Sequence, residues 1–392
     1  MDTRKIMVVD DEPDLQMLIL QRFRKQIQQD IYEFCFAENG EEALSLLNEE
    51  DDISLVLSDL NMPKMDGLTF LSEAQKLDIP ALKTVIVSAY GDMENIRTAM
   101  NRGAFDFITK PIDFSDLEIT IEKGLNEINV ILESEKQKVL WESVQSDLET
   151  AARIQQKILP QEEPAYPDNH AFNIYGEMHT ARQVGGDFFD YFMLDEKHLG
   201  FVIGDVSGKG VPASIYMAVS RTMLKAIASQ IDDPAECLDT VNMMLIPESD
   251  ITTFVTVFYA VLNLETGKVR YSNGGHNLPY IVTKDGDVSM IDNTNGLLLG
   301  KIEGIQYETK EIQLNPGDKI LLYTDGVTEA MDENEEFYEE ERLEEFLIKH
   351  AGDNINKLLR GIIVDVLKFA NKAEQSDDIT LLVMEYLGLE NN

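Results

Sequence analysis

Residues 5–11 read KIMVVDD, a short β-branched run that ends in two adjacent carboxylates, Asp10 and Asp11. Apolar runs of the same kind recur at residues 54–57, 84–87 and 106–109, and amphipathic stretches typical of helices separate them. Continuous apolar strands that alternate with helices predict a parallel sheet with helices on both faces. We therefore expect an α/β domain over residues 1–123, built on a doubly wound, five-stranded parallel sheet.

The carboxyl ends of these runs carry the residues that can do chemistry. Asp59 and Ser88 follow two of the runs, and Lys110 follows the last. Because parallel strands bring their carboxyl ends to one edge of the sheet, these side chains should meet Asp10 and Asp11 there. Three carboxylates in one pocket repel one another unless a cation is present, and Mg²⁺ is the natural fit. A carboxylate beside Mg²⁺ can attack phosphorus and form an aspartyl phosphate.

This set of DD, D, S and KP resembles the receiver domain of bacterial response regulators. The resemblance implies that Asp59 is the phosphoacceptor and that a sensor histidine kinase supplies the phosphoryl group. It also implies a Mg²⁺ site formed by Asp10, Asp11, Asp59 and the backbone carbonyl of Asn61. The implied switch residues are Ser88, Phe107 and Lys110, with a cis peptide bond before Pro111. The alternative is a set of strand-end caps and surface charges.

Residues 124–160 are polar and favour a helix, with no proline before Pro160. Apolar residues recur there at three- and four-residue steps, as in the seam of a coiled coil, and residues 133–138 interrupt the seam. We favour a helical coiled-coil linker that pairs two copies of the chain as a homodimer. A single linker helix packed on its own domains is the alternative. Pro160, Pro164 and Pro167 then predict a boundary loop.

Beyond this loop, strand runs stand apart from two helical stretches at residues 213–230 and 353–370, which predicts a layered α+β domain over residues 161–392. Four acidic motifs punctuate it: GGDFFD at 185–190, GDVSGKG at 204–210, YTDG at 323–326 and SDDIT at 376–380. Each places an aspartate at a strand end or beside glycine, where the backbone can approach an ion closely. Oxygen ligands favour Mg²⁺ or Mn²⁺, and two such ions can clamp a phosphoryl group.

The motifs resemble the PPM (PP2C-like) serine/threonine phosphatases, in their bacterial SpoIIE/RsbU-type branch. The matching stretches occur in the family's order: AARIQQKILP, ARQVGGDFFDYF, GDVSGKGVPAS, FVTVFYAVLNLETGKVRYSNGGHNLPYIV, YTDGVTEA and DDITLLV. The resemblance implies an αββα sandwich, two Mn²⁺ or Mg²⁺ ions, and a core in which Asp187 and Asp205 are catalytic. The implied metal ligands are Asp187 as the bridging group, Asp205, the Val206 carbonyl, Asp325 and Asp377, with Asp378 less favoured than Asp377.

Two further residues have alternative interpretations. Arg182 occupies the place of a phosphate-binding arginine in eukaryotic members of the family, and a surface salt bridge is the alternative. His276, in the sequence GGHN, could be a ligand or general acid, but we favour a structural hydrogen bond.

The net charge of −39 opposes binding to nucleic acid or to anionic membranes. Cys35 and Cys237 lack metal-type spacing and suit the core of a protein in a reducing compartment. Without a signal peptide or a long apolar segment, we expect a cytoplasmic protein. The resemblances together imply a response regulator that dephosphorylates a STAS-type anti-anti-sigma factor in partner switching. The alternatives are a non-catalytic adaptor and an enzyme acting on a small phosphate ester.

Overall fold

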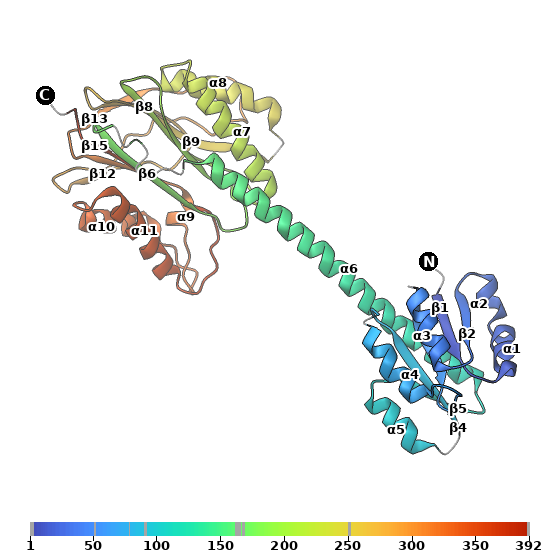
Figure 1. The fold of residues 1–392 in the computed structure, drawn as a ribbon. Helices are drawn as coiled ribbons and strands as arrows, with labels where there is room; N and C mark the ends of the chain where they lie inside the picture. The colour runs from blue at the N-terminus through green and yellow to red at the C-terminus, as the bar shows by residue number, and fades with distance from the viewer. Residues whose placement is uncertain are drawn as a thin grey trace. The chain divides into compact units, whose positions relative to one another are not determined.

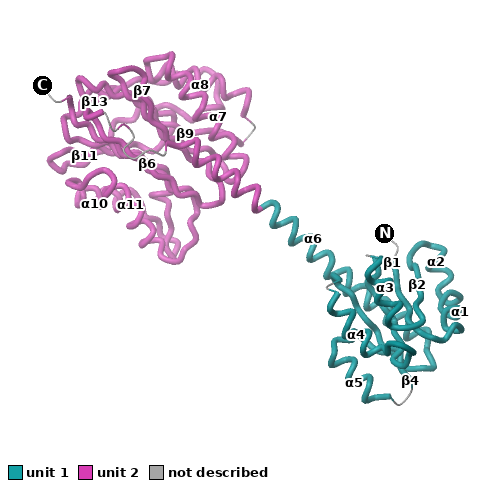
Figure 2. Tube along the Cα trace, in the orientation of Figure 1, with its two compact units in different colours: residues 1–144 teal, residues 145–392 magenta. Residues whose placement is uncertain are grey.

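The computed structural model describes residues 4–50, 52–77, 79–89, 92–160, 166, 169–249 and 252–389. The chain forms two compact units, Met1–Val144 and Gln145–Asn392 (Figure 2). Of the boundary loop predicted from its prolines, Pro164 and Pro167 lie outside the described residues.

The first unit is built on a five-stranded parallel sheet with strand order β2-β1-β3-β4-β5. Its strands are β1 (Arg4–Val9), β2 (Tyr32–Ala37), β3 (Ile53–Asp59), β4 (Lys83–Ala89) and β5 (Asp106–Lys110). Its helices are α1 (Pro13–Arg22), α2 (Arg24–Gln28), α3 (Gly40–Glu49), α4 (Gly67–Ala74) and α5 (Met93–Asn101), with a 3₁₀ turn η1 (Gln75–Leu77). The predicted doubly wound α/β sheet is confirmed.

Both faces of this sheet are buried, and the side chains alternate between two cores. Along β1, Ile6 and Val8 join one hydrophobic cluster, and Met7 and Val9 join the other. Side chains of successive strand residues point to opposite faces, so a strand covered on both sides is apolar throughout. This explains the uninterrupted run that precedes Asp10.

A single helix, α6 (Phe114–Ile158), continues from the first unit into the second. Leu117, Ile121, Leu125 and Ile128 bury its first turns against the sheet of the first unit. The polar stretch at residues 133–138 interrupts the apolar seam but not the helix, since it contains helix-favouring residues and no proline. None of the described helices is long and apolar enough to cross a membrane.

The second unit contains two five-stranded sheets with helices on their outer faces (Figure 1). One sheet has the order β13-β10-β9-β8-β7, from β7 (Phe188–Met193), β8 (His198–Val206), β9 (Val255–Asn263), β10 (Lys268–Gly274) and β13 (Lys310–Gln313). The other has the order β12-β11-β14-β15-β6, from β6 (Phe172–His179), β11 (Tyr280–Val282), β12 (Val288–Met290), β14 (Lys319–Tyr323) and β15 (Ile379–Tyr386).

The helices complete four layers. Helices α7 (Val211–Ala228) and α8 (Pro234–Leu245), followed by η2 (Ile246–Glu248), contact the first sheet. Helices α10 (Glu339–His350) and α11 (Ile355–Ala370) contact the second, and the short α9 (Asp325–Thr328) follows β14. The predicted αββα sandwich is confirmed.

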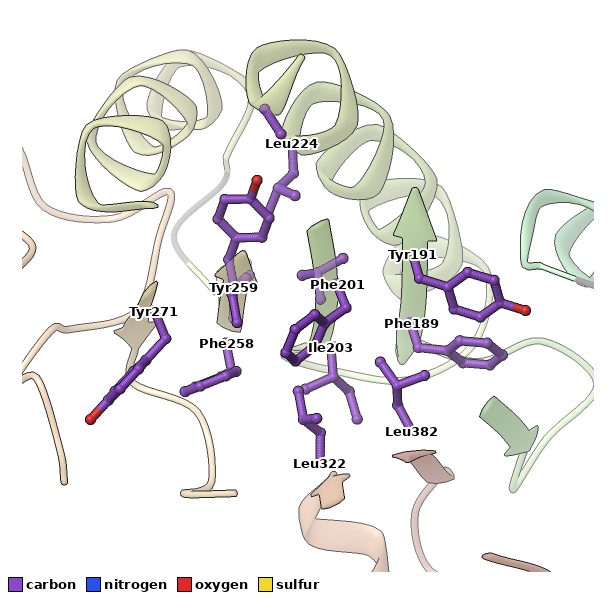
Figure 3. Packing of buried hydrophobic residues seen from close by; sticks show 14 of the residues in the cluster. Phe189, Tyr191, Phe201, Ile203, Leu224, Phe258, Tyr259, Tyr271, Leu322 and Leu382 are labelled. Atoms are coloured by element: carbon purple, nitrogen blue, oxygen red, sulfur yellow. The ribbon is translucent and has the colours of Figure 1, made fainter. Parts of the chain in front are cut away.

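Aromatic and aliphatic side chains fill the space between the two sheets, and the same cluster continues under α7 and α8 (Figure 3). Strand β14 shows how its sequence, KILLY, serves two cores. Ile320 and Leu322 join the cluster between the sheets, whereas Leu321 and Tyr323 join the cluster under α10 and α11. Strand β14 is therefore anchored on both faces, and it ends directly before Thr324 and Asp325.

Candidate functional site

Three carboxylates meet at the carboxyl edge of the parallel sheet. Asp10 and Asp11 follow β1, and Asp59 is the last residue of β3. One carboxylate oxygen from each lies within 4.8 Å of those of the other two. Asp10 and Asp59 are buried and Asp11 is exposed. Burial raises the pKa of Asp10, so a cation here would relieve a real electrostatic cost. All-oxygen donors fit a hard divalent cation.

Lys110, the last residue of β5, reaches into this cluster. Its Nζ lies 2.7 Å from Asp59 Oδ2, 2.9 Å from Asp10 Oδ2 and 3.2 Å from Glu12 Oε1. Burial acts to lower the pKa of Lys110, but the hydrogen bonds to Asp59 and Asp10 outweigh it and hold the pKa above its usual value. The lysine is therefore charged and pairs with the predicted phosphoacceptor.

The remaining predicted residues of the receiver are Asn61, which contacts Asp59, and the switch residues Ser88 and Phe107 on β4 and β5. The backbone N–H of Asn61 donates to Asp59 Oδ1 at 3.4 Å. Ser88 is fully buried, and its Oγ has no hydrogen-bond partner among the described residues. Such an unsatisfied hydroxyl beside the strand that carries Asp59 is suited to bind a phosphoryl oxygen. Phe107 is partly exposed on β5, and the Lys110–Pro111 peptide bond is cis.

A second group of carboxylates gathers in the sandwich. Asp187 precedes β7, Asp205 lies near the end of β8, Asp325 begins α9, and Asp377 lies two residues before β15. Burial and the charge of Asp325 raise the pKa of Asp205 to about 7, and burial with Glu329 and Asp377 raises that of Asp325 to about 6. Burial and Asp205 also raise the pKa of Asp187 well above its usual range. The charge of Asp205 thus acts on Asp187, and the charges of Asp325 and Asp377 act on Asp205.

Hydrogen bonds fix Asp187, the most buried of these four aspartates. Thr324 Oγ1 donates to Asp187 Oδ2 at 2.7 Å. Asp378 lies beside Asp187 with both carboxylate oxygens on backbone N–H groups: Oδ1 accepts from Ala181 at 2.8 Å, and Oδ2 accepts from Gly186 at 2.7 Å. Asp378 therefore orders the loop that carries Asp187. Sequence reasoning did not assign this role, although the adjacent acids at 377–378 were a visible signal.

Three glycines let the backbone pack closely around Asp378 and the Val206 carbonyl. A Cβ at Gly185 would collide with the Asp378 carboxylate, and a Cβ at Gly326 would collide with the Asp378 backbone. A Cβ at Gly186 would lie 2.8 Å from the Val206 carbonyl, which therefore faces the same loop. The glycines in the GGD and TDG motifs are thus required for packing around the aspartates.

Comparison with known proteins finds a related family for each half of the chain. The family profile of the response regulator receiver domain matches residues 6–122, and that of stage II sporulation protein E (SpoIIE) matches residues 195–387. The phosphoserine phosphatase RsbU of Bacillus subtilis (strain 168) is 27% identical over 271 residues, which is 69% of this chain and 79% of RsbU.

The chain joins a response regulator receiver domain to a SpoIIE-type phosphatase domain.

Two further likenesses concern one half of the chain each. The transcriptional regulatory protein GlrR of Escherichia coli (strain K12) is 35% identical to the receiver part over 122 residues, which is 31% of this chain and 26% of GlrR. The solved structure of the SiaA-PP2C domain of Pseudomonas aeruginosa covers 63% of this chain and 98% of that domain, with a TM-score of 0.56. Its sequence identity is 20%, so the likeness shows the fold alone. Phosphatases of the PP2C family are generally Mg²⁺- or Mn²⁺-dependent.

The last turns of α6 hold the loop of the SpoIIE-type domain that carries Asp187. Gln155 is buried, its Nε2 donates to the Gly185 carbonyl at 2.7 Å, and its Oε1 accepts from the Gly185 N–H at 3.0 Å. Gly185 lies two residues before Asp187. A helix that extends into the receiver thus ends on the loop that positions a predicted metal ligand. The motif AARIQQKILP contained this glutamine, but nothing in the sequence indicated its partner.

His276 is buried between strand ends of the SpoIIE-type domain. Its Nε2 lies 3.1 Å from the Tyr323 carbonyl, and its Nδ1 lies 2.9 Å from Thr256 Oγ1. A carbonyl can only accept, so Nε2 carries the proton and Nδ1 accepts from the Thr256 hydroxyl. Both ring nitrogens are therefore in use, as expected for a structural histidine.

Two cations border the carboxylate group. Arg182 is exposed, and its Nη1 lies 3.9 Å from the position that a Cβ at Gly210 would take. Lys209 Nζ lies 2.9 Å from Asp377 Oδ2. The prediction that Arg182 binds phosphate is untested by this geometry, and Lys209 was not singled out from the sequence.

Proposed function

We propose that this protein is a response regulator that hydrolyses phosphoserine or phosphothreonine on a STAS-type anti-anti-sigma factor, under control of Asp59 phosphorylation. The main support is the group of four aspartates, each of which lies at a different strand end, with Asp187 and Asp377 held by hydrogen bonds. RsbU and a second relative, RsbP of Bacillus subtilis (strain 168), are both named phosphoserine phosphatases. A phosphorylated serine on a partner protein is therefore the substrate that we assign.

In the phosphatase site we assign metal binding to five groups: Asp187, Asp205, the Val206 carbonyl, Asp325 and Asp377. A pair of Mn²⁺ or Mg²⁺ ions bound there would supply an activated water and neutralise the phosphoryl group. Asp187 is oriented by Thr324, and its loop is held by Asp378 and Gln155. Arg182 lies at the exposed rim, where it can bind a phosphoryl oxygen.

In the receiver we assign Asp59 as the nucleophile that takes a phosphoryl group from a sensor histidine kinase. Asp10, Asp11, Asp59 and the Asn61 carbonyl would hold Mg²⁺, which would neutralise the phosphoryl group during transfer. Lys110 already contacts Asp59 and can form an ion pair with a phosphoryl oxygen once Asp59 is phosphorylated. The Ser88 hydroxyl, which has no hydrogen-bond partner among the described residues, can donate to another phosphoryl oxygen. Phe107 then repacks as the surface around Ser88 changes.

We infer that α6 carries the signal and pairs two copies of the chain. Of the predicted seam, Leu132, Leu140 and Val144 stay exposed, whereas Ile121, Leu125 and Ile128 pack into the core of the receiver. Solvent-exposed apolar residues at these steps suit the seam of a coiled coil. At its end, Gln155 connects the helix to Gly185. A change in helix pairing can therefore reach the loop of Asp187.

The adaptor alternative is not favoured, because a pseudophosphatase would be expected to lack part of the aspartate group. An experiment distinguishes a phosphatase that acts on a small phosphate ester from one that acts on a phosphoprotein. Hydrolysis should be measured on phosphoserine-containing STAS-domain proteins and on p-nitrophenyl phosphate, with Mn²⁺, Mg²⁺ or EDTA. We expect the phosphoprotein to be preferred and EDTA to stop turnover. A preference for the small ester, or full turnover in EDTA, would refute the proposal.

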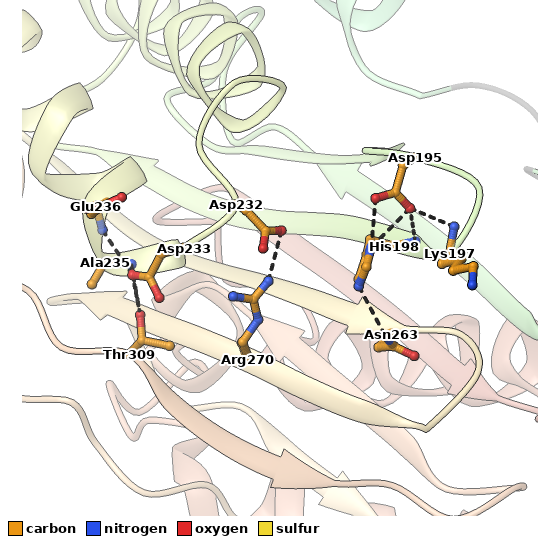
Figure 4. A network of polar contacts seen from close by, with 10 residues as sticks. All are labelled: Asp195, Lys197, His198, Asp232, Asp233, Ala235, Glu236, Asn263, Arg270 and Thr309. Carbon is orange, nitrogen blue, oxygen red and sulfur yellow. Dashed lines mark hydrogen bonds and ion pairs between the residues drawn. The ribbon is translucent and has the colours of Figure 1, made fainter.

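The same assay tests the ligands. Asp187→Asn and Asp325→Asn should lower the rate roughly 100-fold or more, because each removes a charged metal ligand. Asp195→Asn is the matched control. Its carboxylate accepts backbone N–H groups of Lys197 and His198 in a surface turn at the far end of β8 (Figure 4). Equal rates in Asp187→Asn and Asp195→Asn would contradict the assignment, provided that circular dichroism shows both proteins folded.

A further inference from the structure

Lys209 is placed on the metal site by the turn between β8 and α7. It stands between Gly208 and Gly210, whose φ angles are +92° and +78°, a backbone conformation that favours glycine. The turn directs the Lys209 ammonium 2.9 Å from Asp377 Oδ2, and the same ammonium donates to the Ser376 carbonyl. The lysine side chain remains 41% exposed, so it can move without disturbing the core.

Lys209 contacts Asp377 Oδ2, the carboxylate oxygen that does not accept the backbone hydrogen bond from Asp378. The other oxygen, Oδ1, accepts the backbone N–H of Asp378 at 2.9 Å. Asp377 also acts electrostatically on Asp205 and Asp325, so it belongs to the same charged group. An ammonium and a divalent ion on the same carboxylate oxygen repel each other, so a metal bound at Oδ2 would weaken the contact between Lys209 and Asp377. Metal binding at Asp377 therefore favours movement of the Lys209 ammonium away from Oδ2.

We propose that Lys209 is a displaceable counter-ion of the phosphatase site: it holds Asp377 while that carboxylate binds no metal, and it binds the substrate phosphoryl group once metal takes Asp377. The inference rests on the proposed function, because it takes Asp377 as a metal ligand. Arg182 lies beside Gly210 in the same turn, so the released lysine joins a second cation at the exposed rim. Two nearby cations can share the oxygens of one phosphoryl group.

This arrangement predicts opposite effects on two ligands. Without the Lys209 charge, the metal has no competitor for Asp377, so Mn²⁺ should bind about tenfold more tightly. The same variant has lost a phosphate-binding cation, so inorganic phosphate should bind the Mn²⁺-saturated protein about fivefold more weakly. A lysine that only stabilises the turn would not give this pair of changes.

The test uses the full chain with Asp11→Asn throughout, which weakens the metal site of the receiver. Mn²⁺ affinity is measured by electron paramagnetic resonance of the free ion, and phosphate affinity by calorimetry at saturating Mn²⁺. The variants are Lys209→Met and the charge-preserving Lys209→Arg. Lys357→Met is the matched control, since Lys357 is an exposed lysine that pairs with Asp353 at 2.7 Å on the outer face of the sandwich.

We expect tighter Mn²⁺ and weaker phosphate binding in Lys209→Met only, with Lys209→Arg close to the parent. Unchanged Mn²⁺ affinity in Lys209→Met, when Asp377→Asn does remove Mn²⁺ binding, would overturn the inference and leave the proposed function standing. If Asp377→Asn leaves Mn²⁺ binding intact, the ligand assignment itself fails. Thermal midpoints of all variants, measured in EDTA, identify any that do not fold, and Lys209→Gln then replaces Lys209→Met.

Discussion

His276 gives a prediction at the scale of a single residue. Burial lowers the pKa of its imidazole to about 4, whereas an unfolded chain leaves histidine near its usual value of about 6.5. Between these values the unfolded state binds more protons, so the free energy of unfolding falls as the pH drops from about 6.5 towards 4. At pH 5 the loss due to His276 should be about 2 kcal/mol.

Urea unfolding at pH 7 and pH 5, in EDTA, can isolate this contribution. Glutamine does not titrate, yet it can accept from Thr256 and donate to the Tyr323 carbonyl, so His276→Gln is the reference. The wild type should lose about 2 kcal/mol more than the variant between the two pH values. The aspartates with raised pKa values act in the opposite direction, but they are present in both proteins. The same pH dependence in both would contradict the inferred neutral histidine.

Much of the receiver site could be predicted at this scale because its key residues follow parallel strands, whereas Asp187 and Asp377 of the phosphatase group precede antiparallel strands. Asp59 and Lys110 end β3 and β5, and parallel pairing brings strand ends together whatever the loops do. Partners that depend on loop shape could not be predicted. Asp378 accepts from Ala181 and Gly186, nearly two hundred residues away in sequence, and no local pattern signals such a contact.

The end of α6 gives a prediction at the scale of an element. Gln155→Ala removes two hydrogen bonds to Gly185, and it leaves buried backbone groups without partners. Turnover at limiting Mn²⁺ should therefore fall roughly tenfold, with partial recovery at high Mn²⁺. The exposed neighbour Gln156→Ala is the control. If the turnover rate depends on Mn²⁺ concentration in the same way in both variants, Gln155 does not have the role that we assign to it.

Element prediction succeeded where periodicity was strong and failed where side chains were mixed. Edge strand β2 was not located, because its sequence, YEFCFA, includes Glu33. Helix α10 was missed because its first turn is entirely acidic and reads as a solvated loop. The domain boundaries proposed at residues 123 and 160 remain predictions. The contact pattern instead divides the chain within α6, after Val144.

The coupling of receiver and phosphatase belongs to the whole molecule. Acetyl phosphate should change the phosphatase rate of the wild type severalfold and leave Asp59→Asn unaffected, because an amide is a poor nucleophile towards phosphorus. Light scattering on the same samples should show a dimer, at least in the phosphorylated wild type. Asp66→Asn is a suitable control, since Asp66 only caps α4. An identical response in wild type and Asp59→Asn would show that the receiver does not act through this residue.

The tight packing of Gly185 and Gly326 against Asp378 also limits how related genes can recombine and still encode a folded phosphatase domain. Three segments that are far apart in the gene must fit one another at the level of single atoms. Recombination between related genes that exchanged only one of them would bring a slightly different backbone against a contact with no spare room. Functional chimaeras should therefore take all three segments from one parent.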